Sequence, residues 1–283
     1  MRLVPVESCA VMTIDWESLK ADAQLKRALK GAEFDALLRN LRIDGESVNT
    51  VAIFSSIDSK NTGLLLRGSF DPKQIATGLK ANGWREESLD GHKVYVHAGD
   101  YVAMPGSNVL FAGTREGAVG VFRAAEDSKE SIVASDAYKK INSTLTKKGQ
   151  PLRAFLLIPQ GTLDMADAAL TATSVALSLF NLGGVGELLK AVNVARGFAV
   201  TVDSGTHEKY PVELCVLMRD EDSARFVSGS LNAMKTISEL ASSDVREQES
   251  LRALRQMSIV RKQEVLAVKM EIPGSALFPP ARR

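Results

Sequence analysis

The stretch VNTVAIFSSIDSKNTGLLLRGSFDP, residues 48–72, decides the fold. It contains two β-type runs, VNTVAIFSS at 48–56 and GLLLRGSF at 63–70, and the polar segment between them predicts a hairpin loop. Asp71 and Pro72 follow as N-cap and first helical residue, and they predict a helix that ends near residue 82. A hairpin followed directly by a helix is typical of α+β folds and does not fit the β-α-β-α rhythm of a parallel sheet.

The rest of the first half extends this pattern on both sides. A strand is predicted before the hairpin, and a helical region with apolar residues at three- and four-residue spacing follows that strand. Three short strands joined by tight turns, and then a helix, are predicted after it. In chain order these segments are 10–15, 16–42, 92–98, 100–105, 108–113 and 115–125.

The second half of the chain restates this order. The expected segments are a strand at 154–159, helices at 161–192, strands at 197–202 and 212–219, a helix at 222–242 and two late strands, MSIVR and EVLAVKMEI. The triplet Pro-Gly-Ser also occurs late in each half, at 105–107 and at 273–275. The shared order, more than the triplet, predicts an internal duplication.

We therefore predict an α+β protein of two tandem, diverged repeats, each a mainly antiparallel sheet with helices packed on one face. Residues 1–146 would form the first repeat, 147–151 a linker, and 152–283 a second, truncated repeat. The truncation is inferred because the second half contains no counterpart of the strand and helix at 108–125.

The bulk composition limits the classes of function. The chain of 283 residues is 45% apolar and 24% charged, which is typical of a globular protein with a core, and its formal net charge is +1. Nucleic-acid binding usually needs a basic face, so no nucleic-acid partner is expected. No signal peptide is predicted, because Pro5, Glu7 and Asp15 interrupt any apolar run near Met1.

The cysteines and histidines do not predict a cofactor. Cys9 and Cys215 lie in apolar, strand-like sequence, which is typical of small buried side chains, although a disulfide between neighbouring strands stays open. The three histidines, His92, His97 and His207, together with these cysteines have no usual zinc-ligand spacing. His92 and His97 lie five residues apart on one strand and so point to opposite faces.

Signatures of catalysis are missing from the sequence. It has no nucleophile elbow, zinc-protease motif or phosphate-binding loop, and the glycines at 183–186 follow a predicted helix, not a strand. Asp15 ends a strand just before a helix, a placement that predicts an N-cap. We therefore predict a protein that is not an enzyme; an enzyme would need a cleft where acids or histidines of both repeats converge.

The most unusual segment is ADAALTATSVALSLFNLGGVGELL at 166–189, which has no charge from Ala168 to Gly186. Its serines, threonines and glycines keep its hydropathy low, so no transmembrane segment is predicted. The segment fits a helix buried between the repeats, or an amphipathic helix that faces lipid. The candidate surface for an apolar ligand consists of Leu170, Val175, Leu177, Leu179 and Phe180.

Three stretches resemble a known group of proteins: LVPVESCAVMTIDWESL at 3–19, LLLRGSFDPKQIATGLKANG at 64–83 and HKVYVHAGDYVAMPGSNVLFAGT at 92–114. They are similar to a group of bacterial α+β proteins of unknown function, many of them exported. The resemblance covers mainly residues 3–125 and carries no functional residue. It implies a periplasmic or extracellular setting if a leader precedes this sequence, and otherwise a cytoplasmic one.

Two functions are compatible with these sequence features. The first is a non-enzymatic binding or structural module of the bacterial envelope or exterior, with a protein or envelope partner. The alternative is a carrier or sensor of an apolar ligand or lipid that uses the helices at 161–192. No cofactor is expected in either case.

Overall fold

The predicted hairpin forms from strands β2 (Val48–Ser55) and β3 (Thr62–Gly68), which pair antiparallel. The register places Val51 opposite Leu66, and both side chains are buried. Ser56 and Asn61 close the loop, because the Ser56 N–H donates to the Asn61 carbonyl at 2.8 Å. The prediction of a hairpin at 48–70 is therefore confirmed.

The computed structural model describes residues 1–20, 22, 36, 38, 39, 41, 43–145, 150–158, 195–205, 209–240 and 255–273, without the side chains of 234 and 237–240. The chain divides into two compact units. Unit 1 comprises Met1–Lys139 and Pro151–Ala154, and unit 2 comprises Lys140–Gln150 and Phe155–Arg283. The predicted boundaries at 146 and 152, with their linker, stay predictions.

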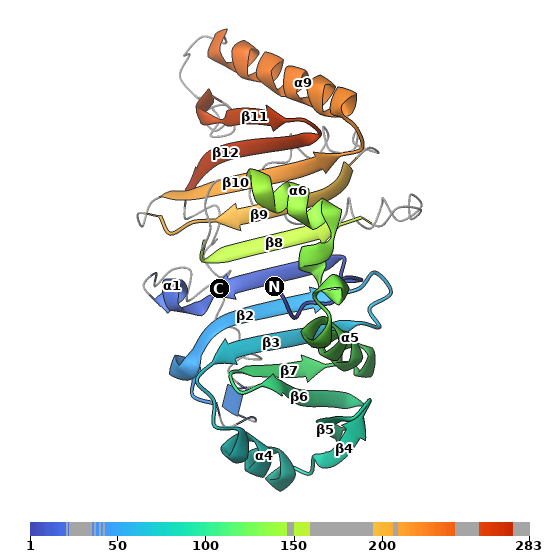
Figure 1. Cartoon of the computed structure of the whole chain (residues 1–283). Coiled ribbons are helices and arrows are strands. Elements are labelled where there is room, and N and C mark those ends of the chain that lie inside the picture. Colours follow the sequence, from blue (N-terminus) through green and yellow to red (C-terminus); the bar gives the residue numbers. More distant parts are fainter. Residues whose placement is uncertain are drawn as a thin grey trace. The chain divides into compact units, whose positions relative to one another are not determined.

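Unit 1 is built on antiparallel strands in the order β1-β2-β3-β7-β6-β5-β4 (Figure 1). Its other strands are β1 (Ala10–Asp15), β4 (Arg85–Leu89), β5 (His92–His97), β6 (Asp100–Gly106) and β7 (Val109–Gly113). Its helical elements are α1 (Trp16–Lys20), η1 (Gly45–Ser47), α4 (Pro72–Ala81), α5 (Arg115–Glu126), η2 (Ser128–Glu130) and η3 (Ile132–Ala134). A further helix, α6 (Asp136–Thr144), continues into unit 2.

The core of unit 1 is organised around Phe111 on β7. Its ring is fully buried, and its centroid lies 6.3 Å from that of Phe54 on β2. Glycines surround this ring: a Cβ at Gly63 would lie 2.3 Å from it, and one at Gly113 or Gly117 would lie 3.0 or 3.1 Å from it. At Gly113 and Gly117 a Cβ would also lie 2.4 or 2.5 Å from the carbonyl oxygen of Thr62. Real Cβ atoms essentially never approach another atom within 3.0 Å, so glycine is needed at all three positions.

Strand β4 is the element that the sequence analysis missed in unit 1. Its sequence, REESL, lacks the alternation of apolar and polar residues that indicates a half-buried strand, and only Leu89 is buried. Backbone pairing with β5 holds it in the sheet, and the carboxylate of Glu86 lies 2.8 Å from the ammonium groups of both Lys80 and Lys93. The strand lies at the end of the order in unit 1.

Replacing Asp71 by alanine should lower the free energy of unfolding by about 1 kcal/mol. As predicted, Asp71 caps α4: its carboxylate accepts a hydrogen bond from the Lys73 N–H at 2.9 Å. Denaturant unfolding followed by tryptophan fluorescence would measure the loss. Asp71→Asn is the matched control, because asparagine caps about as well. Equal losses in both variants would show that the charge, not the cap, is what stabilises the helix.

Unit 2 has strands β9 (Ala195–Val202), β10 (Lys209–Met218), β12 (Val265–Pro273) and β11 (Ser258–Lys262), which pair antiparallel in that order (Figure 1). Strand β8 (Leu152–Leu157) precedes β9 in the sheet order, and the Ile158 N–H donates to the Arg196 carbonyl. Helix α9 (Glu221–Leu240) follows β10. Both units are thus mainly antiparallel sheets with helices, an α+β architecture.

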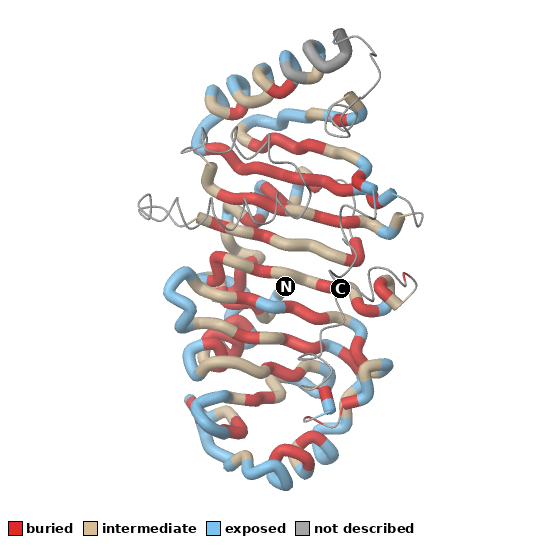
Figure 2. Tube along the Cα trace, turned by 180° about the vertical axis from the view of Figure 1, so that it is seen from behind, coloured by how far each residue is buried: buried red, intermediate tan, exposed pale blue. Residues whose placement is uncertain are grey.

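The sheet of unit 2 is covered on both faces, so the prediction of helices on one face is wrong here. Helix α9 packs Ala224 and Leu231 into the hydrophobic core formed by one face, which includes Leu214 and Val216. Helix α6 packs on the other face, where Ile141 lies against Gly197. Strand β10 is accordingly buried almost throughout (Figure 2). The physical reason is its continuous apolar run, which suits a strand covered on two sides.

Candidate functional site

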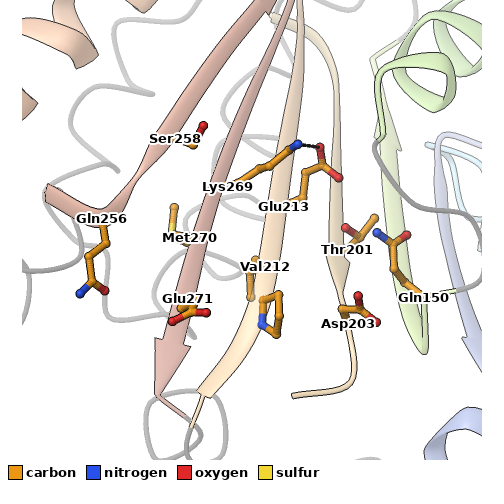
Figure 3. A pocket seen from close by; sticks show the side chains of 11 residues that line it. Gln150, Thr201, Asp203, Val212, Glu213, Gln256, Ser258, Lys269, Met270 and Glu271 are labelled. Atoms are coloured by element: carbon orange, nitrogen blue, oxygen red, sulfur yellow. Dashed lines mark ion pairs between the residues drawn. The ribbon is translucent and has the colours of Figure 1, made fainter. Parts of the chain in front are cut away.

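A row of polar side chains crosses the sheet of unit 2. The register places Glu213 of β10 opposite Thr201 of β9 and Lys269 of β12, and Lys269 opposite Ser258 of β11. Directly opposite residues share a face, so the four side chains lie on the same side of the sheet (Figure 3). This side is opposite to the one that packs against α9.

Burial sets part of this row apart from ordinary surface residues. Six polar or charged residues are buried among the described residues, and three of them, Gln150, Thr201 and Glu213, line one pocket. Glu213 is only 6% exposed. Burying such groups costs free energy unless hydrogen bonds or charges compensate. Their concentration in one place therefore marks this pocket as the candidate site.

Lys269 provides an opposite charge for Glu213. Its ammonium lies 3.9 Å from the Glu213 carboxylate, and its side chain is 40% exposed. This distance is well beyond the 2.7–2.9 Å of a charge-assisted hydrogen bond, so the pair is loose. Glu213 is thus a buried carboxylate whose ammonium neighbour is half in solvent.

A second row of residues, Asp203, Pro211 and Glu271, lies beside the first. It lies near the end of β9, the start of β10 and the end of β12. Pro211 pairs with Glu271, and the Asp203 N–H donates to the Pro211 carbonyl at 2.9 Å. The Glu271 carboxylate lies 3.7 Å from the ammonium of Lys209, and both side chains are more than half exposed. This row forms the solvated rim of the site.

Together these residues line an open pocket of about 560 Å³. That volume is within the usual range for small-molecule sites. Val212 and Met270 also line it, although alternation places their side chains on the opposite face, where Met270 packs against the core. The complete lining is Gln150, Thr201, Asp203, Pro211, Val212, Glu213, Gln256, Ser258, Lys269, Met270 and Glu271 (Figure 3).

Gln150 contributes an unsatisfied acceptor. It directly precedes Pro151 and β8, is 7% exposed, and lines the pocket. Its side-chain Oε1 is buried and meets no hydrogen-bond donor among the described residues. This oxygen is covered by protein and not open to the pocket, and a buried polar atom without a partner costs about 1–3 kcal/mol.

Cys215 lies two residues from Glu213 on the same face. Burial, and after it the nearby charge of Glu213, raises the pKa of its thiol to about 12, while Lys269 opposes the rise. Burial also raises the pKa of Cys9, whose Sγ donates to the Ser55 carbonyl at 3.4 Å. Both cysteines are free and buried, so the expectation of small buried side chains is confirmed and the possible disulfide is absent.

The aspartate and histidines that the sequence offered as candidates for chemistry do not form a site. Asp15 is an N-cap as predicted, since it accepts a hydrogen bond from the Ser18 N–H at 3.2 Å. His92 stacks on Phe122 and contacts Glu126, while the ring of His97 lies tilted against that of Trp84, so the structure does not bring the two histidines together. No cluster of three or more His, Cys, Asp or Glu residues in the described ranges is arranged to hold a metal ion.

The candidate apolar-ligand surface, Leu170, Val175, Leu177, Leu179 and Phe180, lies outside the described residues, as do His207 and the glycines at 183–186. Of the helices that the structure describes, none combines the length and hydropathy needed to cross a membrane. The pocket of unit 2 was not predicted from the sequence. Its one available signal was Glu213, an acid within the apolar run VELCVLM.

Comparison with known proteins gives a fold but no family. No protein-family model matches the sequence, and no curated protein matches it. The structure is similar to that of TP0453, from the bacterium Treponema. Against its crystal form IV the TM-score is 0.54, with 11% identity over 98% of this chain and 93% of that chain. Against crystal form III the values are 0.52, 10%, 98% and 94%. At this identity the likeness concerns the fold alone.

Proposed function

We propose that this protein is a non-enzymatic binding module that holds a small organic molecule in the pocket of unit 2. The observation that carries the proposal is the convergence of Gln150, Thr201 and Glu213, all buried, on one cavity. A fold that needed these positions only for stability would gain more from apolar residues there, since buried ion pairs seldom stabilise more than apolar side chains of similar volume.

The character of the nearest thiol supports binding over catalysis. Thiolate is the reactive form of cysteine, and a pKa raised to about 12 keeps Cys215 protonated near neutral pH. Glu213 has a lysine beside it and no histidine among the residues that line the pocket. These features suit recognition of a ligand better than nucleophilic attack on it.

We further infer that the two units descend from one ancestral unit. The support is topological: the orders β1-β2-β3-β7-β6 and β8-β9-β10-β12-β11 match strand for strand. A helix follows the third strand in each unit, and an aspartate caps each helix, Asp71 for α4 and Asp220 for α9. Six residues separate β2 from β3, and six residues also separate β9 from β10.

The repeated Pro-Gly-Ser triplet does not support this inference. Pro105 and Gly106 end β6, which pairs with β5 and β7, whereas Pro273 ends β12, which pairs with β10 and β11. The two triplets therefore follow strands with different places in the order. If the two units are related in this way, β12 corresponds to β7, and β4 and β5 are present only in unit 1 among the described strands.

The bacterial envelope or exterior setting and the protein partner stay predictions from the sequence. So does the alternative in which the helices at 161–192 carry an apolar ligand or lipid. Binding of a small molecule in the pocket of unit 2 does not require those helices.

Native mass spectrometry would test the proposal. Protein purified gently from cells should carry a small additional mass that organic extraction removes. Ser258→Trp should abolish that mass, because Ser258 lines the pocket from β11 and an indole there would fill it. Lys262→Trp is the matched control on the same strand and the same face, at a position that does not line the pocket.

Two results would contradict the proposal. One is a wild-type mass of 30.5 kDa with no addition before extraction. The other is an added mass that Ser258→Trp retains as fully as Lys262→Trp does.

A further inference from the structure

We propose that the outer face of helix α9 binds the same face of a second copy of this chain, with the two helices antiparallel about a twofold axis. This inference goes beyond the proposed function, because α9 packs on the sheet face opposite to the polar row of the pocket. Its structural basis is an exposed phenylalanine that lies beside a glycine and an alanine on a stretch of helix without charges.

Phe226 is the most exposed large apolar side chain among the described residues, at 73%. Helix α9 turns Ala224 and Leu231 into the core of unit 2. With about 3.6 residues per turn, Phe226, Gly229 and Ala233 lie on the opposite side of the helix, and all three are exposed. The outward side of a surface helix usually carries polar and charged residues, so this ring marks the face as a candidate contact surface.

Gly229 provides an independent observation on the same face. Glycine in the interior of a helix is less stable than alanine, because it loses more conformational freedom. A Cβ at Gly113 would lie 2.4 Å from the Thr62 carbonyl oxygen, whereas one at Gly229 would meet no atom within 4 Å in the part of the chain that the structure describes. The packing around Gly229 therefore does not require glycine, but a second helix that approached this face closely would.

Polar groups beside this face are already bonded within the helix. The Ser230 hydroxyl donates to the Phe226 carbonyl at 3.1 Å. The Thr236 hydroxyl donates to the Asn232 carbonyl, also at 3.1 Å. No charged residue occurs at 226–234. Covering this face thus costs little, because these hydroxyl donors keep their partners and no charge leaves water.

A second copy fits this face because the face carries both a large side chain and a gap. When the helices run antiparallel with the twofold axis between Gly229 and Ser230, Phe226 of each copy lies at the height of Ala233 of the other. Each ring then meets a small residue, and the glycine lets the two backbones come close. Such a contact is isologous, since the same patch serves both copies.

The charges that precede this face favour the antiparallel direction. Asp222 and Arg225 form an ion pair of 3.6 Å within one turn of α9. A parallel pair of helices would place each of these charges beside its own copy. In the antiparallel pair the two Arg225 residues lie about 13 Å apart along the axis, beyond the screening length of about 8 Å at physiological ionic strength.

Sedimentation velocity of the full chain at pH 7 would test the inference, over about 1 to 300 µM, a range that suits an interface of small area. We expect a monomer at the low end and a dimer at the high end. Phe226→Glu should raise the dissociation constant at least tenfold. Val260→Glu is the matched control, because Val260 is also exposed, at 46%, but lies on β11.

Gly229→Leu separates association from folding. Leucine has the higher helix propensity and its Cβ has room, so the midpoint of thermal unfolding should rise at a concentration where the wild type is monomeric. The same side chain would fill the gap and should raise the dissociation constant of the dimer at least tenfold. Circular dichroism checks that each variant is folded.

Oxidative crosslinking tests the direction of the helices. Cys9 and Cys215 are buried, so an introduced surface thiol is the reactive one. Ser230→Cys lies beside the twofold axis and should give a disulfide-linked dimer. Asp222→Cys should not, because the two copies of residue 222 lie about 22 Å apart along the axis of the antiparallel pair.

Several results would overturn the inference. These are a monomer at every concentration, a dimer that Phe226→Glu weakens no more than Val260→Glu does, and efficient crosslinking of Asp222→Cys. A monomer that floats with vesicles of phosphatidylcholine and phosphatidylglycerol, and no longer does so as Phe226→Glu, would show that the face binds lipid instead. The proposed function is decided separately, by the mass-spectrometric comparison of Ser258→Trp with Lys262→Trp.

Discussion

Replacing Phe111 by alanine should lower the free energy of unfolding of unit 1 by about 3–5 kcal/mol. The ring is fully buried, and three of the residues around it, Gly63, Gly113 and Gly117, have no side chain that could move into its place. The cavity left by the substitution should therefore close only in part. The loss should therefore lie toward the upper end of this range.

Tryptophan fluorescence during denaturant unfolding measures this effect selectively. Both tryptophans of the chain, Trp16 and Trp84, belong to unit 1. Ile53→Ala is the control: Ile53 lies on β2 in the same unit but is 40% exposed, so its loss should cost less than 1 kcal/mol. Similar losses for the two variants would show that Phe111 does not organise the core.

The thiol of Cys215 should react with a disulfide reagent about 100- to 1000-fold more slowly in the folded protein than in the unfolded chain at pH 8. Its pKa is raised from 9.0 to about 12, so the folded protein contains correspondingly less thiolate. A Cys9→Ser background leaves Cys215 as the single thiol, because the chain has two cysteines. The absorbance of the released reagent anion gives the rate.

The same shift predicts a loss of stability in alkali. The folded protein holds the Cys215 proton more tightly than the unfolded chain does, so this contribution to stability is complete below pH 9 and is lost as the pH rises toward 12. Cys215→Ala, compared in the same background, should remove that part of the alkaline decline. A native reaction rate close to the unfolded one would contradict both expectations.

Local sequence signals predicted the elements well, and physical reasons explain where they failed. Asp15 and Asp71 were identified as N-caps because capping depends only on residues within one helical turn. Strand β4 was missed because it is held by backbone pairing with β5, while its side chains are almost all exposed and do not form an apolar face. Backbone pairing alone leaves no periodic pattern in a sequence.

The pocket could not be predicted because it depends on register. Thr201, Glu213, Ser258 and Lys269 are far apart in the chain and become neighbours only when four strands align residue by residue. A shift of one residue in any strand would turn its member of the row to the other face. The burial of Glu213 could not be predicted either, because the apolar run of β10 does not indicate what covers each of its residues.

The charged edge of unit 1 has a consequence for how the protein behaves at high concentration. An end strand offers unpaired backbone groups on which a second chain could build an intermolecular sheet, and charged side chains oppose such growth. Hydrogen bonds from Lys80 and then Lys93 keep the pKa of Glu86 below its usual range. Strand β4 therefore keeps this charge into mildly acidic solution, where many carboxylates lose theirs and proteins begin to form aggregates.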